Sequence, residues 1–248
     1  MRKSVLALAL LLVVPLLALG SPATAQAAVP NPVVIIGGTA GASDYDTLGA
    51  RLRADGYSVT FFGLPGDQLG DVHADAIALR AHVDSVRQRT GAAKVNLVAH
   101  SKGGLVARDY VKFLGGATNV DKLIALGAPN NGTLLTSLLN FLGLGNCLGV
   151  VACNQMAIGS AYLKNLNAGD DSIGNVRYTN IATKLDEVVN PYQTAFLNAS
   201  DGNIANITLQ DQCLFRLVEH FGLVKDATVY SGIRQALQGN AVRMNCSA

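Results

Sequence analysis

The sequence shows no excess of charge of either sign. Its 248 residues include 19 lysines and arginines against 17 aspartates and glutamates, and charged residues make up only 15% of the chain. Leaving out Arg2 and Lys3, which belong to an N-terminal segment considered next, takes the basic count from 19 to 17 and leaves the acidic count at 17. Nucleic-acid binding depends on a basic surface that neutralises phosphates. The balanced, scattered charge therefore argues against a nucleic-acid partner.

Apolar runs long enough to cross a membrane are absent after the N-terminus. The N-terminal run, residues 5–19, follows a basic start, is interrupted by Pro15 and precedes small residues at alternate positions. This order is typical of a secretory signal peptide. A retained anchor is the alternative, but the run is short for a bilayer span. We expect cleavage between Ala25 and Ala28, giving an extracellular protein without stable membrane insertion.

Internal repeats, low-complexity tracts and interdomain linkers are also missing. Removal of residues 1–27 leaves residues 28–248, which suit a single catalytic domain with a substantial core. Short β-branched apolar runs alternate with helix-like segments along this part of the chain. The expected strands are residues 33–37, 57–62, 95–99, 122–126, 176–183 and 204–209, and the expected helices are residues 45–54, 72–89 and 105–114. This alternation predicts an α/β fold, with a mainly parallel central sheet flanked by helices.

Nucleotide-binding fingerprints are absent. The glycine-rich turn at residues 37–43 has neither the G-x-G-x-x-G register of a dinucleotide site nor the lysine of a P-loop. The turn follows a predicted buried strand, at the edge of the sheet where active residues of parallel sheets gather. A phosphate cradle is therefore disfavoured, and a catalytic use of its backbone N–H groups stays open.

Cysteines are few, and all four lie in the exported part. An even number of cysteines in an oxidising compartment favours disulfides over free thiols. Closing a short loop costs little entropy, which favours a Cys147–Cys153 pair and leaves Cys213 for Cys246. A metal site is the alternative. It is disfavoured because His220 is the only histidine near a cysteine.

The main catalytic signal is a strand, a sharp turn and a helix around Ser101. Residues 95–99 form the expected strand, and the helix-like segment 105–114 follows the turn closely. This context is required by a nucleophile elbow, in which the serine takes a strained backbone conformation. Small residues are needed two positions before and after the serine, and here they are Ala99 and Gly103. The motif thus reads A-x-S-x-G. The alternative is an ordinary strand–helix connection in which glycine only permits close packing.

A serine nucleophile needs a histidine base and an orienting carboxylate, which follow it in this fold in the order acid, then histidine. Three of the four histidines precede Ser101, so His220 is the candidate base. Asp186 directly follows the strand expected at 176–183 and is the preferred acid. The competing acids are Glu187, its nearest neighbour, and Asp211, which follows the last strand. Two further acidic residues lie before the strand and are expected to be solvated turn residues, namely Asp170 and Asp171.

A tetrahedral intermediate also needs N–H donors for its oxyanion. One donor is the residue after the nucleophile, here Lys102, and the other comes from the turn after the first strand. We expect the backbone N–H of Thr39 to fill the second position, with Gly38 as the alternative.

On these residues the chain resembles the secreted bacterial lipases of the α/β-hydrolase superfamily, particularly the small esterase and lipase group with alanine before the elbow. The matching segments are residues 33–43, 90–104, 128–133, 183–189 and 218–222. The resemblance implies carboxylic-ester hydrolysis through an acyl-enzyme, with Ser101, Asp186 and His220 as triad. It also implies Thr39 and Lys102 as oxyanion donors and no metal or organic cofactor. Separately, we expect a monomer. The charged side chain of Lys102 departs from the usual pattern, which leads us to expect an altered acyl or alcohol preference.

A strongly apolar segment, residues 134–163, bears on which class of substrate the protein binds. It forms either the wall or lid of an acyl-binding cleft, suited to an oil–water interface, or a helix packed in the core.

Three hypotheses for the function follow from these residues. The first hypothesis is a secreted triacylglycerol lipase or esterase. The second is an acyltransferase that uses the same triad. The third is a non-catalytic binding protein with this fold, which is disfavoured because no triad member is missing.

Overall fold

The computed structural model describes residues 30–39 and 45–248. The expected signal peptide and its cleavage site lie outside the described residues, as does part of the glycine-rich turn after Thr39. Within the described residues, every helix is too short or too polar to cross a membrane.

A six-stranded sheet forms the centre of the molecule, in the order β2-β1-β3-β4-β5-β6. Every neighbouring pair runs parallel. The strands are β1 (Val33–Ile36), β2 (Val59–Phe62), β3 (Val95–His100), β4 (Val120–Leu126), β5 (Arg177–Ala182) and β6 (Ile204–Thr208). Each strand expected from the sequence is present with small shifts at its ends, and the predicted parallel α/β fold is confirmed.

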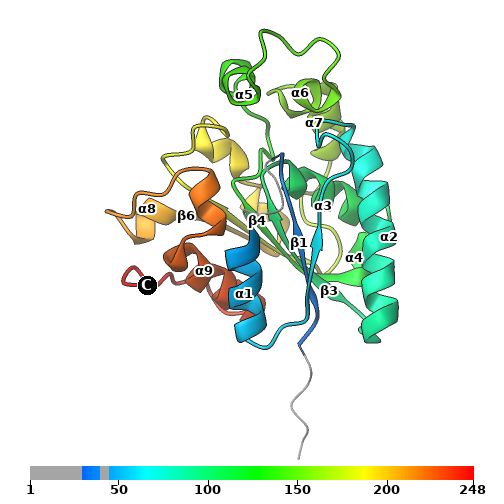
Figure 1. Cartoon of the computed structure of the whole chain (residues 1–248), viewed down its shortest axis with the longest axis vertical. Coiled ribbons are helices and arrows are strands. Elements are labelled where there is room, and N and C mark those ends of the chain that lie inside the picture. The colour runs from blue at the N-terminus through cyan, green and yellow to red at the C-terminus, as the bar shows by residue number, and fades with distance from the viewer. Residues whose placement is uncertain (1–29, 40–44) are drawn as a thin grey trace, which may run out of the picture.

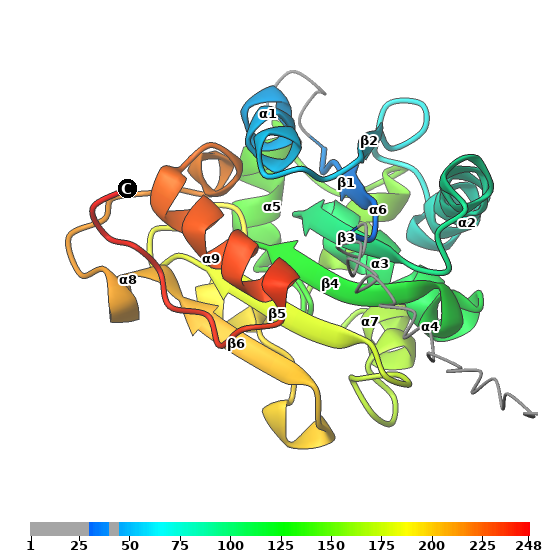
Figure 2. The ribbon, with the colours of Figure 1, turned by 90° about the horizontal axis from the view of Figure 1, so that it is seen from below.

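Helices cover both faces of the sheet (Figure 1 and Figure 2). The α-helices are α1 (Asp46–Ala54), α2 (Val72–Thr90), α3 (Lys102–Phe113), α4 (Gly116–Asn119), α5 (Leu135–Leu142), α6 (Val151–Met156), α7 (Ala161–Leu166), α8 (Leu209–Gln212) and α9 (Ala227–Gln238). The 3-10 helices are η2 (Tyr192–Ala195), η3 (Ala199–Asp201) and η4 (Phe221–Val224). Helices α1 and α9 pack on one face, whereas α2 and α3 pack on the other.

The central strands are buried on both faces, which explains their continuous apolar runs. In β1, Val34 and Ile36 pack toward α2 and α3, whereas Val33 and Ile35 pack toward α1 and α9. Successive side chains of a strand point to opposite faces, so a strand between two helical layers needs apolar residues at every position.

Helix α2 was expected from the amphipathic pattern of residues 72–89, and one of its apolar residues does not face the core. Leu79, Val83 and Val86 are buried, but Ile77 is 53% exposed. The buried stripe continues to Ala76 and Val72 at steps of three and four residues. Ile77 lies one residue off this stripe and therefore faces solvent.

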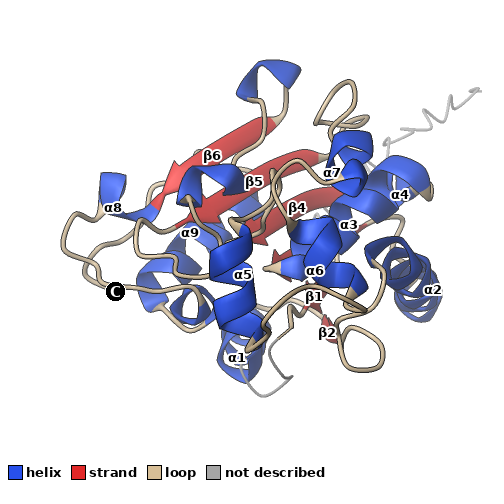
Figure 3. Cartoon of the chain, turned by 90° about the horizontal axis from the view of Figure 1, so that it is seen from above, coloured by secondary structure: helices blue, strands red, loops and turns tan. Residues whose placement is uncertain are grey.

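The apolar segment expected between residues 134 and 163 forms three short helices, α5, α6 and α7, over the carboxyl ends of the strands (Figure 1 and Figure 3). The prediction of a helix packed in the core holds in part, whereas a role as wall or lid of an acyl-binding cleft stays a prediction. Leu138, Met156 and Leu163 are buried in the core cluster that includes α2 and α3, whereas Leu135 and Leu148 face solvent. The segment thus combines a buried side with an exposed apolar side.

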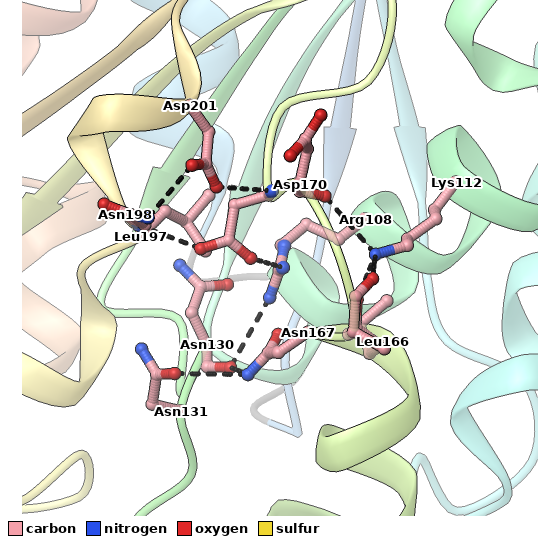
Figure 4. A network of polar contacts seen from close by, with 12 residues as sticks. Arg108, Lys112, Asn130, Asn131, Leu166, Asn167, Asp170, Leu197, Asn198 and Asp201 are labelled. Atoms are coloured by element: carbon pink, nitrogen blue, oxygen red, sulfur yellow. Dashed lines mark hydrogen bonds and ion pairs between the residues drawn. The ribbon is translucent and has the colours of Figure 1, made fainter.

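A polar network attaches the loops around this segment to α3 (Figure 4). Lys112 Nζ donates to the carbonyls of Leu166 and Ala168 at 2.8 and 2.7 Å. The buried guanidinium of Arg108 pairs with Asp171, with 2.9 Å between Nη2 and Oδ1. Asp171 also accepts the backbone N–H of Asn198. The expectation of a solvated Asp171 is therefore wrong, because a buried arginine needs a carboxylate partner.

Candidate active site

Ser101 occupies a strained turn between β3 and α3. Its φ and ψ are 54° and −129°, a region that residues with a side chain rarely adopt. The turn is held because Ser101 N–H donates to the carbonyl of Leu126 at 3.0 Å. The side chain is placed between strand and helix, as a nucleophile elbow requires.

The residues around the elbow are small because the backbone approaches closely. A Cβ at Gly103 would lie 2.5 Å from the carbonyl oxygen of Gly37, and one at Gly104 would lie 2.3 Å from the Cβ of Ala128. Gly38 has the same constraint, since its Cβ would lie 2.8 Å from that of Ser101. The turn after β1 is thus in direct contact with the elbow.

His220 and Asp186 form a buried pair at the same edge of the sheet. His220 Nδ1 lies 2.9 Å from Asp186 Oδ2, and both side chains are shielded from solvent. The other carboxylate oxygen accepts the backbone N–H groups of Val188 and Val189 at 3.0 and 2.6 Å. The carboxylate is therefore held by three donors in a fixed orientation.

The competing acids contact other groups. Glu187 accepts the backbone N–H of His220 at 3.2 Å, so it supports the loop but does not contact the imidazole. Asp211 pairs with Lys184 at the surface, with 2.6 Å between Nζ and Oδ1. Of these three acidic residues, only Asp186 reaches the imidazole of His220.

The remaining ring nitrogen of His220 is buried and has no hydrogen-bond partner among the described residues. The ring packs beside the elbow, with its centroid 4.6 Å from that of His100. Ser101 itself is only 5% exposed. Nε2 is thus a free acceptor next to the elbow, and catalytic hydrogen bonds of this kind often shorten only when substrate is bound.

A second buried histidine, His100, joins three parts of the site. Gly38 N–H donates to the hydroxyl oxygen of Tyr45 at 2.7 Å, and this hydroxyl lies 2.9 Å from His100 Nδ1. His100 Nε2 lies 3.2 Å from the carbonyl oxygen of His220. A carbonyl can only accept, so Nε2 carries the proton and Nδ1 accepts from Tyr45.

The environment keeps His100 neutral. Burial lowers the pKa of His100 well below its ordinary value, and the neighbouring His220 lowers it further. This relay was not predicted from the sequence. A histidine directly before the candidate nucleophile was visible, but its partner Tyr45 could not be identified without the fold.

The structure bears on two expectations about the oxyanion donors. Gly38 N–H is already used by Tyr45, so Gly38 does not serve as the alternative donor. The Lys102 side chain is fully buried and points to α2, where Nζ lies 2.8 Å from Asp75 Oδ2 and donates to the carbonyls of Gln68 and Gly70. The contact with Asp75 is an ion pair without hydrogen-bond alignment. The Lys102 charge is thus paired against α2 inside the protein, and the expected change of acyl or alcohol preference stays a prediction.

The backbone N–H of Lys102 nevertheless opens α3, so it has no carbonyl one turn earlier in the helix. Thr39 directly follows Gly38, whose Cβ position lies against the elbow.

The cysteines pair as expected from loop closure. Cys147 is joined to Cys153, and Cys213 to Cys246. None of the four is available as a metal ligand. Within the described residues, no group of histidine, cysteine and acidic side chains is placed to hold a metal ion.

Comparison with known families and sequences gives a consistent result. The family model described as Lipase (class 2) matches residues 30–226. Triacylglycerol lipases of Pseudarthrobacter phenanthrenivorans and Burkholderia plantarii are each 32% identical over 119 residues, or 45% of this chain. These matches cover 37% and 33% of the two proteins, so the chain matches about a third of the length of these relatives.

Solved structures share the architecture. Lipase B of Aspergillus fumigatus superposes with a TM-score of 0.76 at 21% identity, covering 88% of this chain and 54% of that one. The mature lipase BlEst2 of Bacillus licheniformis has a TM-score of 0.65 at 18% identity, covering 84% and 92%. At such identities the likeness shows a common fold, the α/β-hydrolase fold.

Proposed function

The chain belongs to the class 2 lipase family, and on this basis we propose that it is a secreted carboxylic ester hydrolase, a triacylglycerol lipase or esterase. The supporting observation is the buried Asp186–His220 pair, whose free Nε2 lies beside a serine in a strained elbow. The named triacylglycerol lipases among its relatives support lipid esters as the substrate class.

In the proposed mechanism, Ser101 Oγ attacks the ester carbonyl while His220 Nε2 takes the hydroxyl proton. Asp186 holds the Nδ1 proton of His220 and stabilises the imidazolium that forms. The C–O bond then breaks, His220 returns the proton to the departing alcohol, and the acyl group stays on Ser101. Water, deprotonated by the same nitrogen, releases the acid in a second cycle.

The oxyanion that forms in each half-reaction needs fixed donors. We assign this role to the backbone N–H groups of Lys102 and Thr39. The position of Lys102 at the start of α3 leaves its N–H unpaired within the helix and adds the partial positive charge of a helix N-terminus. Its buried side chain, held by Asp75, fixes this end of the helix against α2.

Acyl transfer to an alcohol remains the second candidate. Ser101 and His220 have little or no exposure, so the acyl-enzyme would form in a site with limited access for water. Product analysis with a competing alcohol distinguishes the two activities. Preferential formation of a new ester at low alcohol concentration would favour transfer, whereas free acid as the main product would favour hydrolysis.

The decisive test is replacement of the nucleophile. Ser101→Ala is expected to lower p-nitrophenol release from acyl esters more than about a thousand-fold, and His220→Ala nearly as much, because triad members act as a unit. Ser58→Ala provides a matched control, since Ser58 is an exposed residue before β2. Undiminished turnover by Ser101→Ala would refute the assignment. A profile from short soluble esters to emulsified triglyceride then separates esterase from lipase.

A further inference from the structure

A short loop beside the site carries three of the most exposed apolar side chains of the described residues. Leu214, Phe215 and Leu217, here called the apolar tip, are 68%, 90% and 81% exposed. They lie between α8 and His220, in the loop at the left side of Figure 1. Scattered apolar residues on a surface are ordinary, but several large ones in one loop mark an interaction surface. The proposed mechanism uses none of them.

The tip is firmly supported at its base. The Cys213–Cys246 disulfide joins the residue directly before the tip to the C-terminal segment. The buried Gln210 donates through Nε2 to the carbonyl of Arg216 at 3.0 Å. A loop held in this way has a restrained backbone, so little backbone entropy is lost on binding.

The same glutamine connects the tip to the loop of the proposed catalytic acid. Gln210 Oε1 accepts the backbone N–H of Lys184 at 2.8 Å, and Nε2 also donates to Thr183 Oγ1. The next residue, Leu185, is 45% exposed and directly precedes Asp186. Apolar groups thus protrude from the two loops that carry Asp186 and His220.

The tip borders an open hollow in the surface. The hollow has a volume of about 350 Å³, and its lining residues are Gln212, Cys213, Leu214, Phe215, Arg216 and Cys246. Because Phe215 is 90% exposed, its aromatic ring can enter a lipid surface without removing a contact from the core.

The charges around the tip indicate which kind of surface it can bind. Arg243, on the C-terminal segment next to the tip, is exposed and forms no ion pair with the described residues, but one free charge is not the basic cluster that an anionic membrane attracts. The two basic side chains of the tip loop and the Asp186 loop each have an acidic partner: Arg216 Nη2 lies 2.7 Å from Asp226 Oδ2, and Lys184 pairs with Asp211. Neither offers a free positive charge to an anionic membrane or an acidic partner. Large apolar groups among paired charges match an uncharged apolar surface.

We propose that the apolar tip, together with Leu185, is an anchor that inserts into the surface of an uncharged lipid-ester aggregate. This anchor is separate from α5–α7, and the inference rests on the proposed ester hydrolase function. Insertion would bring the loops of Asp186 and His220 to the lipid surface.

The test measures binding without turnover. In the Ser101→Ala background, partition to triolein droplets coated with zwitterionic phosphatidylcholine is measured by flotation. The combined change Leu214→Ser, Phe215→Ser and Leu217→Ser is expected to weaken binding at least about tenfold, because it removes the inserted apolar groups. Phe215→Leu alone should retain most of the binding. With Ser101 intact, activity of the triple variant on a soluble short-chain ester should match that of the wild type.

A matched control is available on the other side of the molecule. Ile77 and Phe113 are also exposed apolar residues, 53% and 41%, on α2 and α3. Ile77→Ser with Phe113→Ser should leave droplet binding unchanged. Equal losses in control and tip variants would overturn the proposal, as would wild-type binding by the tip variant.

Two further outcomes identify other occupants. A wild-type dimer in light scattering that the tip variant lacks would assign the tip to a second copy of the chain. Stronger binding to anionic than to zwitterionic droplets, lost at high salt, would assign it to a charged membrane. Either result would overturn the proposal. Droplet binding without any ester hydrolysis by the wild type would instead refute the proposed function and leave the anchor standing.

Discussion

The hydroxyl of Tyr45 lies between the turn after β1 and the elbow. It accepts from Gly38 N–H and donates to His100, which in turn donates to the carbonyl of His220. Three chain segments that must keep their mutual positions during catalysis are thereby joined by buried hydrogen bonds. Tyr45 and His100 touch no reacting atom in the proposed mechanism, so they are positioning residues.

Replacement of this hydroxyl tests that role. Tyr45→Phe is expected to lower kcat about tenfold and leave KM within about twofold, because small errors in catalytic geometry act mainly on the transition state. Kinetics on a soluble ester measure both constants. Tyr230→Phe is the matched control, since its hydroxyl bonds Asp55 at the surface. A changed KM with unchanged kcat would contradict a positioning role.

The neutral state of His100 makes stability depend on pH. Burial and the neighbouring His220 lower the pKa of His100 in the folded protein, while in the unfolded chain it titrates near about 6.5. Below that pH the unfolded state binds one more proton, so the free energy of unfolding falls as the pH falls, by up to about 1.4 kcal/mol per pH unit.

His100→Gln removes this titration and keeps one donor and one acceptor. Its urea-unfolding free energy should therefore decline less steeply between pH 7 and pH 5 than that of the wild type. Other groups that titrate in this interval contribute to both proteins alike. Parallel slopes would show that the folded protein can protonate His100.

The groups that face the His100 ring are Tyr45, His220 and Phe221.

Among the elements, the two disulfides constrain loops of very different length. Cys147 and Cys153 are six residues apart, just before and within α6, whereas Cys213 and Cys246 are 33 residues apart and join the loop before His220 to the C-terminal segment. A crosslink that closes a longer loop removes more entropy from the unfolded chain.

Paired replacement by serine should therefore give unequal losses. Chain entropy predicts about 3.7 kcal/mol for Cys213→Ser with Cys246→Ser, and about 2.2 kcal/mol for Cys147→Ser with Cys153→Ser. Urea unfolding of the two double variants measures the difference. An equal loss, or a larger one at the shorter loop, would show that contacts of the sulfur atoms in the folded state outweigh loop entropy.

For the molecule as a whole, the parallel sheet brings the site together at one edge. The turn of Gly38 follows β1, Ser101 follows β3, and Asp186 follows β5. His220 comes from the segment after β6 and α8. Parallel strands all end at the same edge of the sheet. Residues that directly follow different strands therefore lie close together, however far apart they are in the sequence.

Export directed by residues 1–27 stays a prediction from the sequence. Expression in a bacterial host with a general secretion pathway should yield protein in the culture medium that begins at Gln26, Ala27 or Ala28, because the small residues before these positions fit signal-peptidase cleavage. Intact-mass spectrometry measures the start. Exported protein that still carries Met1, or protein retained in the cell membrane, would contradict it.

Local sequence determined much of the fold and of the candidate site. Continuous apolar runs, amphipathic periods and the small residues around Ser101 predicted the strands, the main helices and the elbow, because each depends on residues close together in the chain. The order of polar residues after the strands also pointed to Asp186 and His220. Cysteine spacing was sufficient for the observed pairing.

Tertiary structure decided what depends on approach between distant segments. The burial of Lys102 against Asp75, the pairing of Asp171 with Arg108 and the relay from Tyr45 to His100 each join residues from separate elements. Their types alone suggested exposed charge or ordinary packing. Whether a polar side chain is solvated or buried is set by the partner that meets it in space, and only folding brings those partners together.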